Sequence, residues 1–193
     1  MANSKVHFGI SGVHYAVLDE ESGTYGTPVP VYGAVKLSIE KEGEESKFYA
    51  DNNVYYVSDT NAGYTGSLEM ALFPDQFLVD VLGFVRDGNG GLIETTESKA
   101  KPFALLYEVD GNASPTRFVF YKVTPSRPTS EANTKTDTTE VDTQTMSITM
   151  APQAFLVGGQ TMHVVKNHIT DSEDSHEAYG SFYEKVVEPK AAA

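Results

Sequence analysis

Apolar and polar side chains alternate along several stretches of this chain, as they do in strands that bury one face. In the clearest stretch, Val35, Leu37 and Ile39 alternate with polar residues. The stretches with this pattern are residues 34–41, 64–72 and 145–150. Shorter strands are predicted over residues 13–19, 46–51 and 54–58. The chain is therefore predicted to be mainly β.

Two further stretches, residues 102–110 and 117–123, are apolar on both faces. Strands of this kind lie in the middle of a sheet or are covered by another element. Residues 111–115 between them combine Gly, Asn, Ser and Pro, which is typical of a turn. We therefore predict that these two strands form a hairpin.

One segment has the spacing of an amphipathic helix. Pro74 suits the first turn of a helix, and Asp75 suits the positive end of the helix dipole. The apolar residues that recur along one helical face are Phe77, Leu78, Val81, Leu82 and Val85. The glycine-rich residues 87–91 then end the pattern. We predict one flanking α-helix, over about residues 74–84, that packs against the sheet.

The length of 193 residues is typical of one domain, so residues 1–193 are predicted to form a single unit. Residues 40–63 and 126–143 are rich in polar side chains, and we expect them to be extended or mobile loops. Residues 152–193 are expected to form a C-terminal extension or arm. Within it, residues 179–187 fit a short helix and a strand equally well.

The chain is strongly acidic, with 14 basic and 27 acidic side chains and a formal net charge of −13. Most of that charge lies in residues 1–96, which hold 5 basic and 14 acidic side chains. Proteins that grip nucleic acid by its phosphates are basic, so that class is disfavoured. The sequence also lacks an apolar run long enough for a transmembrane helix and the features of a signal peptide, so we expect no membrane partner.

Candidate chemistry is sparse. The chain has no cysteine, which excludes disulfides, thiolate nucleophiles and cysteine-ligated metals. Residues 87–91 lack the later carboxylates of a calcium loop. Imidazoles and carboxylates that could hold a transition metal gather near the C-terminus, but with no known zinc spacing: His163, His168, Asp171, Glu173, Asp174 and His176. No set of nucleophile, base and orienting group is recognisable. We expect no enzyme activity, no metal and no cofactor.

Tyrosines cluster in the middle of the chain, at Tyr49, Tyr55, Tyr56 and Tyr64. Exposed tyrosines anchor protein interfaces and stack on sugar rings, whereas tyrosine also favours ordinary strand packing. A carbohydrate-binding β-sandwich that uses Tyr55, Tyr56 and Tyr64 is therefore one functional alternative.

The order and spacing of seven segments resembles the major tail protein, or tail tube protein, of long non-contractile-tailed bacteriophages (siphophages). The segments are residues 12–18, 25–28, 33–40, 48–52, 74–83, 102–108 and 117–122. The resemblance covers most of the chain but not residues 152–193. It implies a tail-tube-type β-sandwich or barrel-like core with a flanking helix and long loops.

The resemblance also implies a function. It implies a structural virion protein, made and assembled in the host cytoplasm, whose rings of six subunits stack into a hollow tube that conducts genomic DNA. The implied partners are further copies of the chain, the tape measure protein, the tail terminator and the distal tail protein. Viral DNA would pass through the lumen without specific binding. A tube-capping or distal tail protein of the same fold is a second alternative.

A tube of this kind assigns roles to polar residues on the predicted strands. An acidic inner wall would repel the phosphates of passing DNA. The lumen-facing candidates are Lys36, Ser38, Glu40, Thr65, Ser67 and Glu69. The candidates for contacts between rings or subunits are Glu42, Glu44, Glu45, Tyr55 and Tyr56.

Overall fold

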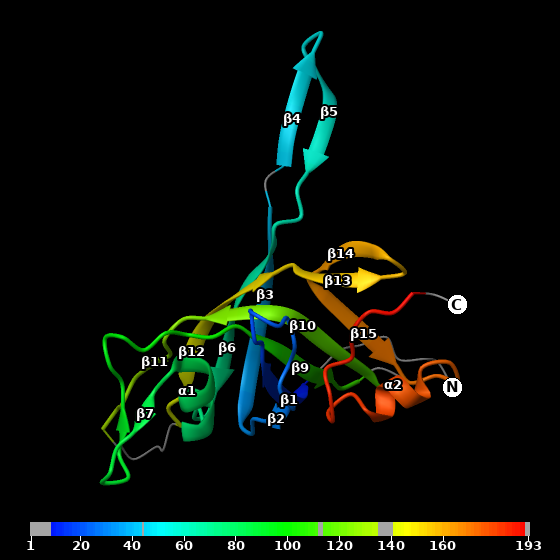
Figure 1. The fold of residues 1–193 in the computed structure, drawn as a ribbon. Helices are drawn as coiled ribbons and strands as arrows, with labels where there is room; N and C mark the ends of the chain where they lie inside the picture. Colours follow the sequence, from blue (N-terminus) through cyan, green and yellow to red (C-terminus); the bar gives the residue numbers. More distant parts are fainter. Residues whose placement is uncertain (1–8, 44, 112–113, 135–140, 192–193) are drawn as a thin grey trace.

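The computed structural model describes residues 9–43, 45–111, 114–134 and 141–191, and its central feature is one large antiparallel sheet (Figure 1). Its main path runs through β2 (Val29–Pro30), β1 (Ile10–Val17), β9 (Phe103–Val109), β10 (Thr116–Pro125), β12 (Gln144–Ala151), β6 (Gly63–Met70) and β3 (Ala34–Glu42). Beside this path, β11 (Thr129–Ser130) pairs with β12, and β15 (Lys166–Thr170) pairs with β10. The prediction of a mainly β fold is confirmed.

Three hairpins extend from this sheet. They are β4 (Glu45–Ala50) with β5 (Asn53–Asp59), β7 (Val85–Arg86) with β8 (Leu92–Ile93), and β13 (Gln153–Val157) with β14 (Gln160–Val164). The β4–β5 hairpin stands clear of the body, beyond the end of β3 (Figure 1). Residues 40–63, expected to be extended or mobile, thus form the end of β3, this hairpin and the start of β6.

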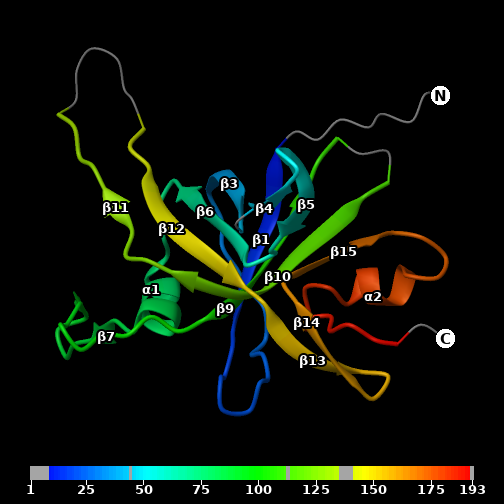
Figure 2. The ribbon, with the colours of Figure 1, turned by 90° about the horizontal axis from the view of Figure 1, so that it is seen from above.

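The sheet curls so that its two ends approach each other without closing a barrel. β1 and β3 contact each other although they lie near opposite ends of the strand order (Figure 2). The curl encloses one apolar cluster, to which the helix contributes Phe77 and Val81. A second cluster covers the other face of β1, β9 and β10. Because β9 lies between both clusters, its first five residues are all buried, as its two apolar faces predicted.

Helix α1 (Asp75–Leu82) forms where its spacing predicted it. Pro74 precedes it with a φ of −63°, and Gly83 ends it in the left-handed conformation, donating its N–H to Leu78. The prediction was wrong for Val85, which lies beyond that glycine on β7 with its side chain exposed. The Tyr15 hydroxyl donates to Asp80 at 2.8 Å and ties the helix to β1.

The C-terminal residues pack on the body through the second cluster. After β15, the short helix α2 (His176–Gly180) leads into turns in which Phe182 and Val186 are buried. Residues 179–187 therefore combine the end of a helix with turns, and contain no strand. Of residues 126–143, the described part includes β11 and a pair of hydrogen bonds from Asn133 to Asp142, while 135–140 lie outside the description. Neither described helix is long and apolar enough to cross a membrane.

Candidate functional site

A polar face runs across three neighbouring strands, β3, β6 and β12. Residues directly opposite each other in antiparallel strands project from the same face. Three such rows cross the strands: Lys36–Glu69–Thr145, Ser38–Ser67–Ser147 and Glu40–Thr65–Thr149. All six residues predicted to face a lumen therefore lie together on this face. The opposite face carries Leu68, Met146 and Ile148, which are buried in the first apolar cluster.

The sequence predicted a strand over residues 145–150 but did not place its polar side chains on this face. Thr145, Ser147 and Thr149 alternate visibly with buried methionines and isoleucine, but the sequence does not show which strand pairs with β6. Thr124 and Lys122 of β10 extend the face, because they lie opposite Thr149 and Ala151. The alternation of polar and apolar residues in β12 was the feature of the sequence that could have identified this third strand of the polar face.

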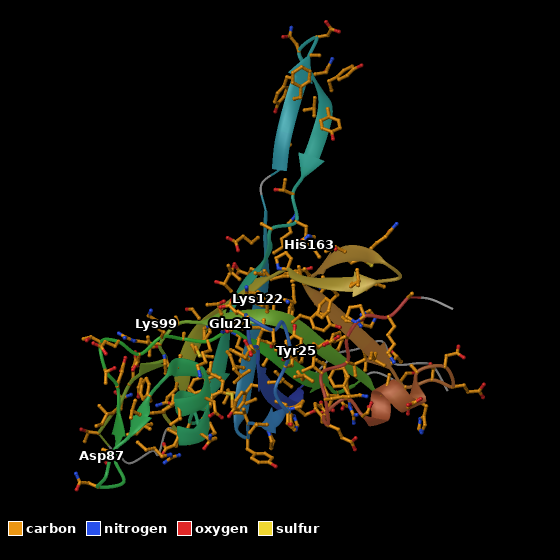
Figure 3. The ribbon with its side chains drawn as sticks, in the orientation of Figure 1. Glu21, Tyr25, Asp87, Lys99, Lys122 and His163 are labelled. Carbon is orange, nitrogen blue, oxygen red and sulfur yellow. The ribbon has the colours of Figure 1, made fainter. Side chains whose placement is uncertain are left out.

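Carboxylates outnumber ammonium groups on the polar face. Three carboxylates, those of Glu40, Glu42 and Glu69, share the face with the ammonium group of Lys36. Lys122, labelled in Figure 3, is neutralised by an ion pair with Glu20, with Nζ and Oε1 2.7 Å apart. Glu69 is further held by a hydrogen bond of 2.7 Å from the Thr143 hydroxyl. The described face is thus hydroxyl-rich with a modest negative charge.

The outer edge of this polar face is open. Within the described residues, β3 has one partner strand, β6, and ends the strand order. A groove of about 390 Å³ separates it from β1 and β9, lined by Ile10, Val35, Leu37, Ile39, Tyr107 and Val109 among others. An open edge strand presents backbone groups to which another chain can pair.

The β4–β5 hairpin prolongs the β3–β6 ladder beyond the polar face. At its base the Ala62 N–H donates to the Glu42 carbonyl at 3.0 Å, and a Cβ on Gly43 would overlap the Thr60 carbonyl oxygen. Its tip is a two-residue turn with φ of 51° at Asp51 and 62° at Asn52. Two positive φ values give a type I′ turn, whose twist suits a two-stranded ribbon.

The residues predicted to form contacts between rings or subunits lie partly on the β4–β5 hairpin and partly on β3. Tyr55 and Tyr56 lie on the hairpin with exposed side chains, and Glu45 begins β4. Glu42 lies on β3, on the same face as Glu40. Glu44 lies outside the described residues.

The residues considered as metal ligands or as a sugar-binding platform do not come together in the described part of the structure. In the described part of the chain, no three His, Cys, Asp or Glu side chains meet as metal ligands would. His176 instead bonds Asp171 at 2.9 Å, and His168 stacks on Phe118. Tyr64 lies on β6, packed against Phe120 and Lys166, whereas the exposed Tyr55 and Tyr56 lie on β5 of the hairpin.

Comparison with known proteins decides the family. A family model described as phage tail tube protein matches residues 2–191. The chain belongs to the phage tail tube protein family. A mainly β fold with one helix packed on the sheet agrees with this assignment, and membership makes the chain a structural protein of the phage tail. No curated protein matches it.

Several solved structures are distantly similar to this tail tube protein. A chain of the anti-feeding prophage (AFP) baseplate is 11% identical, with a TM-score of 0.47, over 88% of this chain and 97% of that one. A chain of the AFP tube terminating cap is 10% identical, with a TM-score of 0.45, over 89% and 100%. The PVC sheath/tube terminator of an extracellular contractile injection system is 10% identical, with a TM-score of 0.44, over 87% and 99%.

Proposed function

We propose that this tail tube protein forms rings of six subunits that stack into the tube of a long non-contractile phage tail and conduct genomic DNA. The observation that supports this most is the polar face of β3, β6 and β12, backed by an apolar core and ending in an open edge. In a ring, the open edge of β3 pairs with a neighbouring subunit, so the polar faces form a continuous inner wall. Closing a sheet in this way removes its edges.

The chemistry of the wall suits a conduit. Ser38, Ser67 and Ser147 form one row across the wall, and their side chains are short and neutral. The surplus of carboxylates repels DNA phosphates, whereas the basic side chains that would hold them are few. DNA therefore slides past without specific binding, and the protein carries out no reaction.

The remaining partners follow from that role. Its partners would be the tape measure protein and the tail terminator and distal tail proteins that cap the tube. Assembly takes place in the host cytoplasm, and the mature protein resides in the virion.

Electron microscopy of the purified protein at rising concentration, with sizing alongside, separates this role from that of a cap. A tube subunit gives hollow tubes or stacked rings. A capping or distal tail protein gives a discrete ring that never stacks, and this result would contradict the proposal.

Charge reversal on the polar face tests the conduit itself. In a phage carrying Glu40→Lys and Glu69→Lys, we expect tails to assemble but infectivity to fall by roughly tenfold or more, because each new ammonium group attracts phosphate. The matched control, Glu97→Lys with Glu184→Lys, changes exposed glutamates off this face and should infect normally. Normal plaque formation by the first variant would count against the lumen assignment.

A further inference from the structure

An asparagine–glycine pair lies at the tip of the β7–β8 hairpin. Of the asparagines in the sequence, Asn89 alone is followed by glycine. Both residues are exposed in the turn between β7 and β8. Gly90 has φ of +83°, and a side chain added there would meet open space. Because glycine has no side chain, its backbone nitrogen can approach the preceding carboxamide without obstruction. This pair is therefore the place in the chain where a side-chain amide is most easily attacked.

The side chain of Asp87 closes this turn. Its carboxylate accepts hydrogen bonds from the Gly91 N–H and from the backbone and side-chain N–H groups of Asn89, the last two at 3.1 Å. The bond from Gly91, followed by those from Asn89, lowers the pKa of Asp87 below its usual range, so the acceptor is ionised at neutral pH. The Gly90 N–H donates to the Asp87 carbonyl at 3.2 Å. The amide and the nitrogen that would react are thus both held by Asp87.

The hairpin below the turn is short and exposed. Among the described residues, its ladder joins Val85 to Ile93 and Arg86 to Leu92. Val85 and Ile93 are about half exposed. The ion pair of Arg86 with Asp75, with Nη1 and Oδ2 3.9 Å apart, is exposed as well. Short elements with few buried contacts open transiently while the rest of a protein stays folded. The turn is therefore expected to open and close in the native state.

We propose that Asn89 is a site of spontaneous deamidation and that Asp87 limits its rate. When the turn opens, the Gly90 nitrogen loses its proton and attacks Cγ of Asn89. The Cγ–Nδ2 bond breaks, and ammonia leaves with a proton from water. Water then adds to either carbonyl group of the resulting succinimide ring and opens it, which gives aspartate or isoaspartate. The inference is independent of the proposed tube.

The product would change the turn that formed it. Asn89 donates to the Asp87 carboxylate through Nδ2, whereas a carboxylate at position 89 has no N–H to donate. Two carboxylates would then face each other, and like charges at this distance repel. The hairpin would therefore be held less firmly. A finished phage particle makes no new protein, so the product would accumulate as the tail ages.

Peptide mapping by mass spectrometry tests the reaction. After incubation of the purified full chain at mildly alkaline pH, the peptide with Asn89 should gain the mass of an amide-to-acid exchange before any other asparagine does. Asp87→Ala should react roughly tenfold faster, because it loses the hydrogen bonds that hold the turn. Glu94→Gln is the matched control, since it removes a partly exposed carboxylate beside β8 and leaves those bonds in place. It should react at the wild-type rate.

Two results of this mapping would overturn the proposal. One is an Asn89 that stays unchanged in the folded protein under conditions that convert it in urea. The other is an equal rate in wild type and Asp87→Ala. An isoaspartyl methyltransferase assay of the same samples should detect the isoaspartate product, and its absence would contradict a succinimide route.

Hydrogen exchange tests the effect of the product on the hairpin. Asn89→Asp places the second carboxylate in the turn, whereas Asn89→Ser removes the amide without adding charge. Residues 85–93 should exchange roughly fivefold faster in the aspartate variant than in the serine variant, because of the added repulsion. Equal exchange in the two variants would contradict a loosening by charge.

Discussion

At the scale of single residues, Tyr183 stands out because its hydroxyl is buried without a hydrogen-bond partner in the described part of the chain. Its ring stacks on His14, with centroids 4.2 Å apart, and lies beneath the Arg117 guanidinium. The hydroxyl fits only because Gly12, with φ of +59°, has no side chain there. A Cβ on Gly12 would lie 2.5 Å from that oxygen.

Gly12→Ala should therefore destabilise the fold by more than strain alone. The left-handed conformation costs an alanine about 1–2 kcal/mol, and the clash adds about 1–3 kcal/mol. Gly23→Ala is the matched control, since Gly23 has φ of +70° and open space around it. Urea denaturation gives both values. Equal losses of unfolding free energy would show that Tyr183 moves aside without cost.

Tyr107 gives a prediction for alkaline pH. Burial raises its pKa to about 12, against about 10 for an exposed tyrosine. The folded state thus holds this proton more tightly than the unfolded state. Its contribution is complete below about pH 10 and falls by about 1 kcal/mol per pH unit between pH 10 and 12. Tyr107→Phe should show a shallower loss of unfolding free energy in that range; an unchanged slope would contradict this.

At the scale of elements, Arg117 connects the main sheet to the C-terminal segment. From β10 it forms an ion pair with Glu108, with Nε and Oε2 3.1 Å apart, and donates to the Tyr179 carbonyl at 2.6 Å. Its guanidinium also lies 4.0 Å from the centre of the Tyr179 ring. Because the Arg117 side chain is mostly buried, its removal would leave the Glu108 carboxylate and the Tyr179 carbonyl without this hydrogen-bond donor.

Arg117→Met should cost about 1–3 kcal/mol and loosen the C-terminal segment. Arg127→Met is the control, because the exposed pair of Arg127 with Glu94 is worth no more than about 1 kcal/mol. Hydrogen exchange of residues 176–187 and chemical denaturation measure the two effects. Similar behaviour of both variants would contradict a locking role for Arg117.

The sequence predicted elements better than their partners. Alternation around Leu37 and Met146 identified β3 and β12, and the proline and glycine around α1 placed the helix correctly. Alternation is a local property, so it assigned the polar faces but not the pairing of β12 with β6. Residues 152–193 lack a strong period, and their place depends on distant contacts such as that of Phe182 with the second cluster.

At the scale of the whole molecule, the β3–β6 ladder relates four features. It carries part of the polar face, its outer edge is open, it bears an apolar hairpin at one end, and the exposed side chains of Tyr32 and Leu72 lie near the other end. Lateral pairing along the open edge would make a ring, and docking along the ladder would stack rings. In the proposed tube, this one pair of strands would contribute to both directions of assembly.

In the proposed tube, the polar face of β3, β6 and β12 lines the lumen. The most direct test is a cryo-electron microscopy reconstruction of the assembled protein. We expect a hollow six-fold tube whose inner wall carries Ser38, Ser67 and Ser147, with α1 away from the lumen. A tube with α1 on its inner wall and the polar face turned outward would contradict it.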